Sequence, residues 1–207
     1  MARRQLTSDT VRRRYDRLAP LYEWVEFPME VLALDRWRRR LISHVQGPRV
    51  LEAGAGTGKN FPLYPPELEV SAIDLSLKML LRSRGKDSAS DIRRAVADVE
   101  RLPFPSDVFD SVLASFLFCS VARPVEGLME LKRVVRPGGR MILLEHMRPG
   151  NPVLGRVFDV LSPLVAPLLG PEINRRTVQN VQRAGLRVEQ ESDLFSDIVK
   201  LMVCRKD

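Results

Sequence analysis

Short apolar runs alternate with helical patterns from residue 49 onward, and this alternation sets the expected fold. Each run has the length of a strand and precedes a stretch with apolar residues at helical spacing, which is typical of parallel strands joined by crossover helices. The expected strands are Arg49–Ala53, Glu69–Ile73, Ile92–Val96, Ser111–Phe118 and Arg140–Glu145. The expected helices lie around Phe61, at Ser76–Ser88 and at Val125–Val135, the last closed by Arg136-Pro137-Gly138-Gly139. The pattern predicts an α/β domain with a mostly parallel sheet.

The pattern changes after the fifth expected strand. Residues 151–170 form an apolar insertion interrupted by prolines, and a helical pattern follows at Asn174–Ala184. Two further strands, Leu186–Phe195 and Asp197–Arg205, are separated by too little chain for a crossover helix. These two strands must therefore pair in antiparallel fashion.

Residues 1–47 are expected to form helices that precede the domain of residues 48–207. Thr7 or Ser8 can cap the first helix. The apolar face of this helix is formed by Val11, Tyr15, Leu18 and Tyr22. The remaining positions are basic and include Arg12, Arg13, Arg14 and Arg17. A second helix is expected after Pro28, with an apolar stripe at Met29, Ala33, Trp37, Leu41 and Val45 and arginines beside it at positions 36, 38, 39 and 40. Both helices are amphipathic and basic.

Composition narrows the possible partners. The chain has 207 residues, 44% of them hydrophobic, which suits one full-sized core. A formal charge of +7 favours anionic partners such as phospholipid surfaces or nucleic acid. Two cysteines and two histidines are too few for a disulfide framework or a Cys/His metal cluster, so we expect no metal and a cytosolic setting. No run is long and apolar enough for a spanning helix or a signal peptide, so any membrane contact is expected to be peripheral.

A glycine-rich segment follows the first expected strand directly. It reads Val50-Leu51-Glu52-Ala53-Gly54-Ala55-Gly56-Thr57-Gly58 and leads into a helical stretch. Such a turn brings bare backbone close to a ligand, although an ordinary tight strand-to-helix turn also uses glycine.

Two phosphate-binding readings of this segment fail on spacing. The dinucleotide pattern G-x-G-x-x-G starting at Gly54 requires glycine where Lys59 stands, and the third glycine comes one residue early, at Gly58. The phosphate-loop pattern requires glycine and Ser/Thr where Ala53 and Asn60 stand. What remains is an acidic residue followed by three alternating glycines.

That form resembles the first motif of class I S-adenosylmethionine methyltransferases. The resemblance implies that Glu52 attracts the cofactor's ammonium, while backbone N–H groups of the loop meet its carboxylate. Asp74, about twenty residues on, would accept the ribose hydroxyls; its competing role as a helix cap can be filled by Ser76. Asp98 would hold the adenine amino group. The expected cofactor-binding residues are Glu52, Gly54, Gly56, Gly58, Asp74, Leu75, Asp98, Val99 and Ser115.

Segments 98–110, 114–121 and 131–140 look like the ubiquinone and menaquinone biosynthesis methyltransferase group. This group shares its core with bacterial phospholipid N-methyltransferases, which the chain resembles most. The resemblance covers residues 15–207. It implies a Rossmann-like fold with a seven-stranded, mostly parallel sheet, a C-terminal antiparallel hairpin and an N-terminal helical appendage.

Three features bear on the methyl acceptor. Tyr15 and Tyr22 lie in a segment similar to the one that closes over the site in this group, and their rings could surround an ammonium, although both could simply pack the helix. Glu145 and His146 follow the fifth strand, where they could balance charge and remove the amine proton. The insertion 151–170 is long enough for an apolar lid, a membrane contact or extra core. The expected substrate-binding residues are Arg148, Asn174 and Arg175, which could hold a phosphate.

Together these features favour methylation of phosphatidylethanolamine to phosphatidylcholine. The enzyme would be a monomer without nucleic acid, resting on the inner, anionic face of the cell membrane. C-methylation of a quinone precursor and thiol methylation are the enzymatic alternatives. A basic binding protein on the same fold is the non-enzymatic alternative, against which the cofactor acids and the arrangement of the aromatic residues argue.

Overall fold

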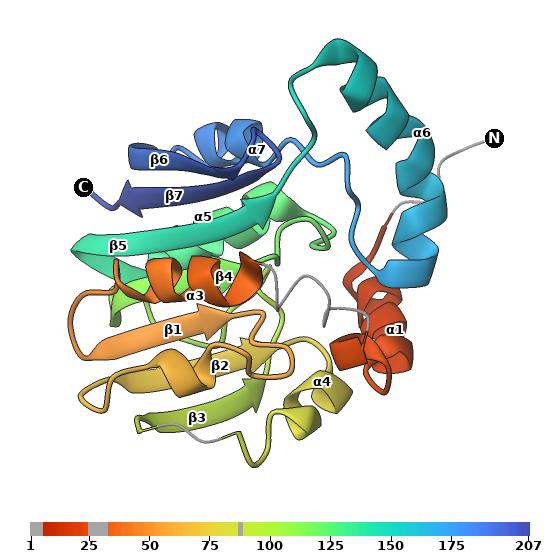
Figure 1. The fold of residues 1–207 in the computed structure, drawn as a ribbon. Coiled ribbons are helices and arrows are strands. Elements are labelled where there is room, and N and C mark those ends of the chain that lie inside the picture. The colour runs from red at the N-terminus through yellow and green to blue at the C-terminus, as the bar shows by residue number, and fades with distance from the viewer. Residues whose placement is uncertain (1–5, 25–32, 87–88) are drawn as a thin grey trace.

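The computed structural model describes residues 6–24, 33–86 and 89–207, which form an α/β domain around one sheet (Figure 1). The strands are β1 (Arg49–Ala53), β2 (Glu69–Asp74), β3 (Asp91–Val96), β4 (Phe109–Ser115), β5 (Val135–His146), β6 (Arg187–Phe195) and β7 (Val199–Arg205). Their order across the sheet is β3-β2-β1-β4-β5-β7-β6. Strands β1 to β5 are parallel, whereas β7 runs antiparallel to β5 and β6. The predicted seven-stranded sheet and its terminal hairpin are confirmed.

Apolar side chains project from both faces of the central strands and form a hydrophobic core on each face of the sheet. One core lies under α5 (Pro124–Val134) and α7 (Thr177–Arg183), where Leu128, Leu131 and Val181 are fully buried. The other lies under α3 (Asp35–Ile42), the 3-10 turn η2 (Phe61–Leu63) and α4 (Leu77–Arg82), and contains Leu41 and Phe61. Burial on both faces explains the continuous apolar runs of the parallel strands.

Two further helices, α1 (Ser8–Leu18) and α6 (Pro152–Leu169), lie beyond the carboxyl ends of the parallel strands (Figure 1). Thr7 caps α1, because its side-chain oxygen accepts a hydrogen bond from the backbone N–H of Thr10. The expected helix start at Pro28 and Met29 lies outside the described residues. Loops from four strands and both helices therefore converge on one edge of the sheet.

Several expected boundaries are shifted, each for a local reason. The strand expected to reach Phe118 ends at Ser115, because Phe116 has a φ of 53°, which an extended strand does not allow. The helix expected at Ser76–Ser88 ends at Arg82, where the Ser83 hydroxyl bonds the Leu80 carbonyl and Gly85 has a φ of 76°; residues 87–88 lie outside the described part. The helix expected around Phe61 is one turn. Residues 136–139 were expected to close the preceding helix as a turn, but they belong to β5, which pairs with β4 across a register shift between Phe109 and Ser111.

The insertion 151–170 is a continuous helix, so the expectation that its prolines break it was wrong. Asn151 caps the helix by accepting from the backbone N–H groups of Val153 and Leu154. Pro163 and Pro167 lie four residues apart on exposed turns, where water can reach the carbonyls that lose a helical partner. No helix in the described ranges combines the length and apolar character needed to cross a bilayer.

Arg38 corrects a second expectation. The pattern placed it among four arginines beside the apolar stripe of a basic amphipathic helix, yet Arg38 is buried and only 5% exposed. Its neighbours Arg36, Arg39 and Arg40 are exposed as expected. A buried arginine needs polar partners, which the site below provides.

Candidate functional site

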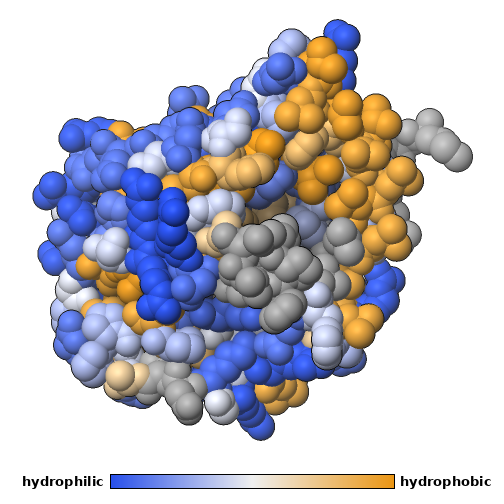
Figure 2. All heavy atoms as spheres, viewed as in Figure 1, coloured by the Kyte–Doolittle hydropathy of each residue, from blue (hydrophilic) through white to orange (hydrophobic). Residues whose placement is uncertain are grey.

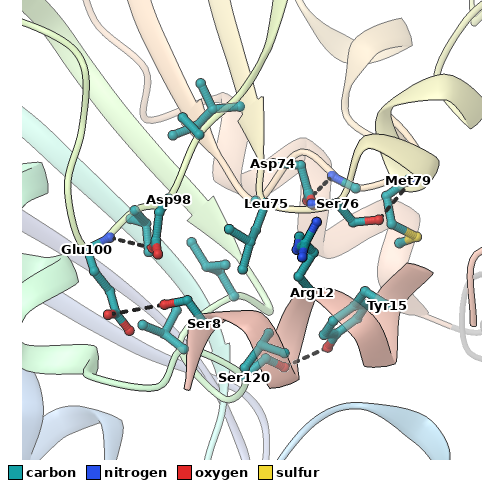
Figure 3. Close-up of a pocket in the computed structure, with 18 of the residues that line it drawn as sticks. Ser8, Arg12, Tyr15, Asp74, Leu75, Ser76, Met79, Asp98, Glu100 and Ser120 are labelled. Atoms are coloured by element: carbon teal, nitrogen blue, oxygen red, sulfur yellow. Dashed lines mark hydrogen bonds between the residues drawn. The ribbon is translucent and has the colours of Figure 1, made fainter. Parts of the chain in front are cut away.

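A cavity lies between α1 and the loops that follow β1, β2, β3 and β4, and its empty space, including the part open to solvent, is about 740 Å³ (Figure 3). Most of the residues predicted for the cofactor come together here. The cavity is lined by Gly54, Gly56, Asp74, Leu75, Asp98, Val99 and Ser115, and by the two predicted tyrosines, Tyr15 and Tyr22. Parallel strands place the ends of β1 to β4 at one edge of the sheet, which explains this convergence.

The glycine loop lies against the cavity with its backbone. Gly54, Gly56 and Gly58 have φ values of 71°, 54° and 76°, which strongly favour glycine. A Cβ on Gly58 would lie 2.6 Å from the Phe61 ring, and one on Gly54 would lie 2.7 Å from the Leu117 side chain. Gly58 thus shapes the loop from behind, while Gly54 and Gly56 face the cavity.

Asp74 ends β2 and holds two loops together. Its Oδ2 accepts from the backbone N–H of Gly56 at 2.9 Å, and its Oδ1 accepts from that of Ser76 at 2.8 Å. The Ser76 hydroxyl caps α4, so Asp74 is not needed for that task. Burial raises the pKa of Asp74 to about 6, and its two backbone hydrogen bonds oppose this rise.

Asp98 occupies the corresponding place after β3. Its Oδ1 accepts from the backbone N–H of Glu100 at 2.9 Å, which fixes the turn. Glu100 accepts from the backbone and side chain of Arg123 at 2.7 and 2.9 Å. Val99 is buried between the two acids in this loop. The acids after β2 and β3 therefore stand on separate rigid turns facing the same cavity.

Glu52 lies behind the glycine loop, not on the described cavity wall. Its two carboxylate oxygens accept from Asn60 Nδ2 and from the Tyr64 hydroxyl, each at 2.7 Å. Burial raises the pKa of Glu52 to about 7, while the bonds from Tyr64 and Asn60 and the charge of Arg38 lower it. Sequence reasoning missed Arg38, Asn60 and Tyr64 as parts of this network, because no pattern along the chain links them.

Helix α1 covers the cavity and bonds to three of its loops, and Figure 3 shows two of these bonds, from Ser8 and Tyr15. Ser8 Oγ donates to Glu100 at 3.3 Å, Ser76 Oγ donates to Asp16 at 2.6 Å, and the Tyr15 and Ser120 hydroxyls lie 2.6 Å apart. The rings of Tyr15 and Tyr22 are 6.2 Å apart with a 57° tilt. Arg12 also lines the cavity, a contact that its place among four arginines did not reveal.

Glu145 and His146 lie apart from the described cavity lining. Glu145 is fully buried, and its Oε1 accepts from the backbone N–H groups of Leu117 and Phe118, both at 2.9 Å. Burial raises its pKa to about 8, and those two bonds oppose the rise. The His146 ring stacks on Phe158 at 5.9 Å, and burial lowers its pKa. This geometry supports a structural role for both side chains.

The three predicted substrate-binding residues also lie away from the described cavity lining. Arg148 and Asn174 both donate to Asp159 on α6, at 2.9 and 3.2 Å. Arg175 donates to the Val121 carbonyl at 2.8 Å and pairs with Glu172. Their described bonds attach α6 and the neighbouring loop to the domain.

The cavity fits the cofactor that the first motif implies. Bare backbone at Gly54 and Gly56 leaves room for close approach, and the Asp74 and Asp98 carboxylates can accept from a ribose and an adenine amino group. Within the described ranges, no group of histidine, cysteine, aspartate or glutamate is arranged to hold a metal ion.

Comparison with known proteins supports this assignment. Residues 51–143 match the methyltransferase domain family. The chain is 30% identical over 173 residues to the ubiquinone/menaquinone biosynthesis C-methyltransferase UbiE of Geobacter sulfurreducens, covering 78% of this chain and 68% of that protein. It is 39% identical over 133 residues to the phosphatidylethanolamine N-methyltransferase of Cereibacter sphaeroides, covering 60% of this chain and 64% of that protein. The matches thus span about two thirds of each relative.

A solved structure shares the fold. The S-adenosylmethionine-dependent methyltransferase of Thermotoga maritima, described as a possible histamine N-methyltransferase, superimposes with a TM-score of 0.74 at 19% identity. The match covers 94% of this chain and 99% of that one. Fold, glycine loop and relatives agree, and the chain belongs to the class I S-adenosylmethionine-dependent methyltransferases of the UbiE-like group.

Proposed function

We propose that this methyltransferase acts on the amine headgroup of phosphatidylethanolamine and its partly methylated derivatives, at the surface of an anionic membrane. The outward face of α6, which is apolar although it faces solvent, carries the membrane part of the proposal, and the paired rings of Tyr15 and Tyr22 support an amine as the acceptor. This face lies beside the helix that covers the cavity (Figures 1 and 2).

The outward face of α6 is a continuous apolar stripe. Its members, between 39% and 72% exposed, are Val153, Leu154, Val157, Val160, Leu161, Leu164 and Leu168. They share one side of the helix, whereas Gly155, Ser162 and Ala166 are buried on the other side. The helix therefore has its apolar side chains outside and small or polar ones inside, as expected for a helix lying in a membrane interface. Figure 2 shows the stripe at the upper right.

The stripe is connected to the cavity cover. Arg17 on α1 donates to the Pro167 carbonyl at the end of α6, at 2.6 Å. Gly170, which ends α6, packs against the Tyr15 ring, because a Cβ there would lie 2.9 Å from it. Arg13 and Arg14 lie on the same basic helix, where they can meet anionic headgroups. We infer that acyl chains lie along α6 while the headgroup enters beside Tyr15.

The reaction needs alignment and exclusion of water. S-adenosylmethionine supplies a methyl group on a positively charged sulfur, and the amine nitrogen must approach it in line. Asp74, Asp98 and the glycine backbone would fix the nucleoside, and α1 would keep water out. The rings of Tyr15 and Tyr22 would surround the amine, which gains permanent positive charge as methyl groups accumulate, by cation–π attraction.

The amine must lose a proton before it can attack. His146 and Glu145 were expected to help, but the Glu145 carboxylate accepts from the backbone N–H groups of Leu117 and Phe118, and the His146 ring stacks on Phe158. We assign this task to Tyr15, whose hydroxyl shares a hydrogen bond with Ser120 at the cavity wall. Only the phenolate form of this side chain can take the proton, which leaves a phenol and a neutral amine. Because a phenol and a primary ammonium both have ordinary pKa values of about 10, this transfer is nearly balanced, and the phenol then loses the proton to water before the next cycle.

C-methylation of a quinone precursor is the second candidate. It is favoured by the relatives' names, since the Geobacter sulfurreducens UbiE and a demethylmenaquinone methyltransferase of Clavibacter sepedonicus both align with this chain. A quinone precursor is also lipidic, so the α6 stripe suits either acceptor. An aromatic ring carbon, however, needs no cation-binding pair of tyrosines.

Transfer of labelled methyl groups distinguishes the two acceptors. We expect label to enter phosphatidylethanolamine in liposomes and Tyr15→Phe to lower this transfer about tenfold or more, as is usual for a general base. Cofactor affinity should stay within about twofold in this variant. Labelling of a demethylquinone but not of phosphatidylethanolamine would overturn the proposal.

The α6 stripe gives a separate prediction. Leu164→Asp should weaken binding to anionic phosphatidylethanolamine vesicles, measured by sedimentation, about 30-fold, because burying one leucine contributes about 2 kcal/mol. Met129→Asp is the matched control, since Met129 is another exposed apolar residue, on α5. Equal vesicle binding by both variants would show that α6 does not meet the membrane.

A further inference from the structure

A second exposed apolar patch lies on the other side of α1 from α6. It consists of Leu21 and Trp24, which follow α1, and of Leu77 and Leu81, which lie one turn apart on the exposed side of α4. We name these four residues the α4 patch, and Trp24 is its most exposed member at 80%. Helix α1 lies between α6 and α4 at the carboxyl edge of the sheet (Figure 1). The α4 patch and the α6 stripe therefore flank the helix that covers the cavity.

Two contacts join the segment after α1 to α4. Arg82 at the end of α4 donates to the Pro20 carbonyl at 2.8 Å, and Lys86 donates to the Glu23 carboxylate at 2.6 Å. These bonds bring residues 20–24 beside α4, so the side chains from the two segments form one surface.

Positive charge surrounds the α4 patch. The exposed cations on and beside α4 are Lys78, Arg82 and Arg84. The hydrogen bond from Lys86 lowers the pKa of Glu23, burial opposes this change, and the charges of Lys86, Lys59 and Arg82 lower the pKa further. Several cations thus act on one carboxylate. Apolar side chains among exposed cations suit a surface where acyl chains lie beneath anionic headgroups.

We propose that the α4 patch inserts into the same anionic lipid bilayer as the α6 stripe. Trp24 suits this position, because indole combines a large apolar body with one N–H donor and is enriched where headgroups meet acyl chains. A second copy of this chain fits the patch less well. Two identical basic surfaces repel each other, and these few side chains offer far less than the roughly 800 Å² per partner that a stable interface buries.

The proposal rests on the membrane part of the proposed function and adds a second contact to it. Arg17 ties α1 to the end of α6, and Asp16 accepts from Ser76, which caps α4. Two contacts with the bilayer hold α1 against it on both sides. The membrane then lies along the edge of the sheet that carries the cavity, so a lipid headgroup reaches Tyr15 without leaving the surface.

Tryptophan fluorescence tests the insertion of Trp24. The chain has two tryptophans, and the other one, Trp37 on α3, is half-buried against the core. Trp37→Phe leaves Trp24 as the reporter, and Trp24→Phe leaves Trp37 as the matched control. On vesicles of phosphatidylethanolamine and phosphatidylglycerol, Trp24 emission should shift to shorter wavelength. Bromine placed near the headgroup end of the acyl chains should quench it more than bromine near their far end, because interfacial segments lie about 5 to 10 Å deep. Trp37 should show neither effect.

Sedimentation of the same samples separates this proposal from the proposed function. Vesicle-bound protein with an unquenched Trp24 would overturn the insertion of the α4 patch and leave the α6 contact standing, whereas absence of vesicle binding would remove both contacts. A Trp24 shift that grows with protein concentration in the absence of vesicles would assign the patch to a second copy of the chain and also overturn the proposal.

A charge placed in the patch gives a second measurement that keeps both tryptophans. Leu77→Asp should weaken vesicle binding about tenfold, because an exposed leucine no longer enters the acyl layer. Aspartate is compatible with the fold here, since Leu77 is the first residue of α4 and acids are favourable at a helix start. Met129→Asp on α5, where Met129 is likewise 55% exposed, is the control. Equal binding by the two aspartate variants would contradict the proposal even if Trp37→Phe did not fold.

Discussion

Asp74→Ala is expected to reduce the affinity for S-adenosylhomocysteine about 100-fold. The side chain contributes twice: its charge can accept two ribose hydroxyls, and its oxygens hold the backbone N–H groups of Gly56 and Ser76. Each charged hydrogen bond is worth about 1.5 to 3 kcal/mol, so losing both ligand bonds explains the size of the effect. Calorimetry at pH 8 measures it. Asp98→Ala should reduce this affinity less, because Asp98 would accept a hydrogen bond from only one group, the adenine amino group.

The pH dependence of binding identifies the carboxylate. The pKa of Asp74 is raised to about 6 by burial, and only the ionised form can accept from both hydroxyls. Affinity should therefore be constant above about pH 7 and fall as the pH drops below 6. Asp74→Asn should bind weakly and show a flatter dependence over this range. Asp91→Ala, at an exposed position at the start of β3, serves as the control. If Asp74→Ala bound S-adenosylhomocysteine with unchanged affinity, the nucleoside would not bind in this cavity.

Glu145→Gln is expected to stabilise the protein at alkaline pH. Burial raises the pKa of Glu145 from 4.5 to about 8, and its Oε2 has no partner among the described residues. A carboxyl whose pKa rises on folding holds its proton more tightly in the folded chain. Folding is therefore most favoured below pH 4.5 and loses stability as the pH rises toward 8. Glutamine does not titrate, and its carbonyl can still accept from Leu117 and Phe118.

Thermal unfolding measures this gain. At pH 9 the glutamine variant should unfold about 5 to 10 °C higher than the parent, which corresponds to about 3 kcal/mol for a chain of this size. At pH 5 the two should nearly coincide. Glu126→Gln, at a half-exposed position paired with Arg123, should leave the difference between pH 5 and pH 9 unchanged. A lower unfolding temperature for Glu145→Gln at pH 9 would mean that the ionised carboxylate is required there.

The sheet and the nucleoside side of the site were predictable because short stretches of sequence determine both. Apolar runs mark the strands, and parallel pairing brings Gly54, Asp74 and Asp98 to one edge without further information. Spacing alone then separates this glycine loop from two phosphate-binding loops. The terminal hairpin followed from a short connection.

The rest depends on how helices pack, which periodicity does not encode. Arg38 looks like its exposed neighbours in the sequence, and only the docking of α3 turns it inward. Glu145 and His146 stand at the correct end of β5, but the loop after β4 and helix α6 use their side chains for support. The outward direction of the α6 stripe was equally hidden, since an apolar helix can face either core or solvent.

The hydrogen bonds between α1 and three separate loops have a kinetic consequence. If a bound nucleoside leaves on the side that α1 covers, the hydrogen bonds of Ser8, Tyr15 and Asp16 must break first, so each turnover includes an opening of this helix. Product would then leave no faster than α1 opens, and deuterium exchange of the amides of residues 8–18 measures the free energy of that opening.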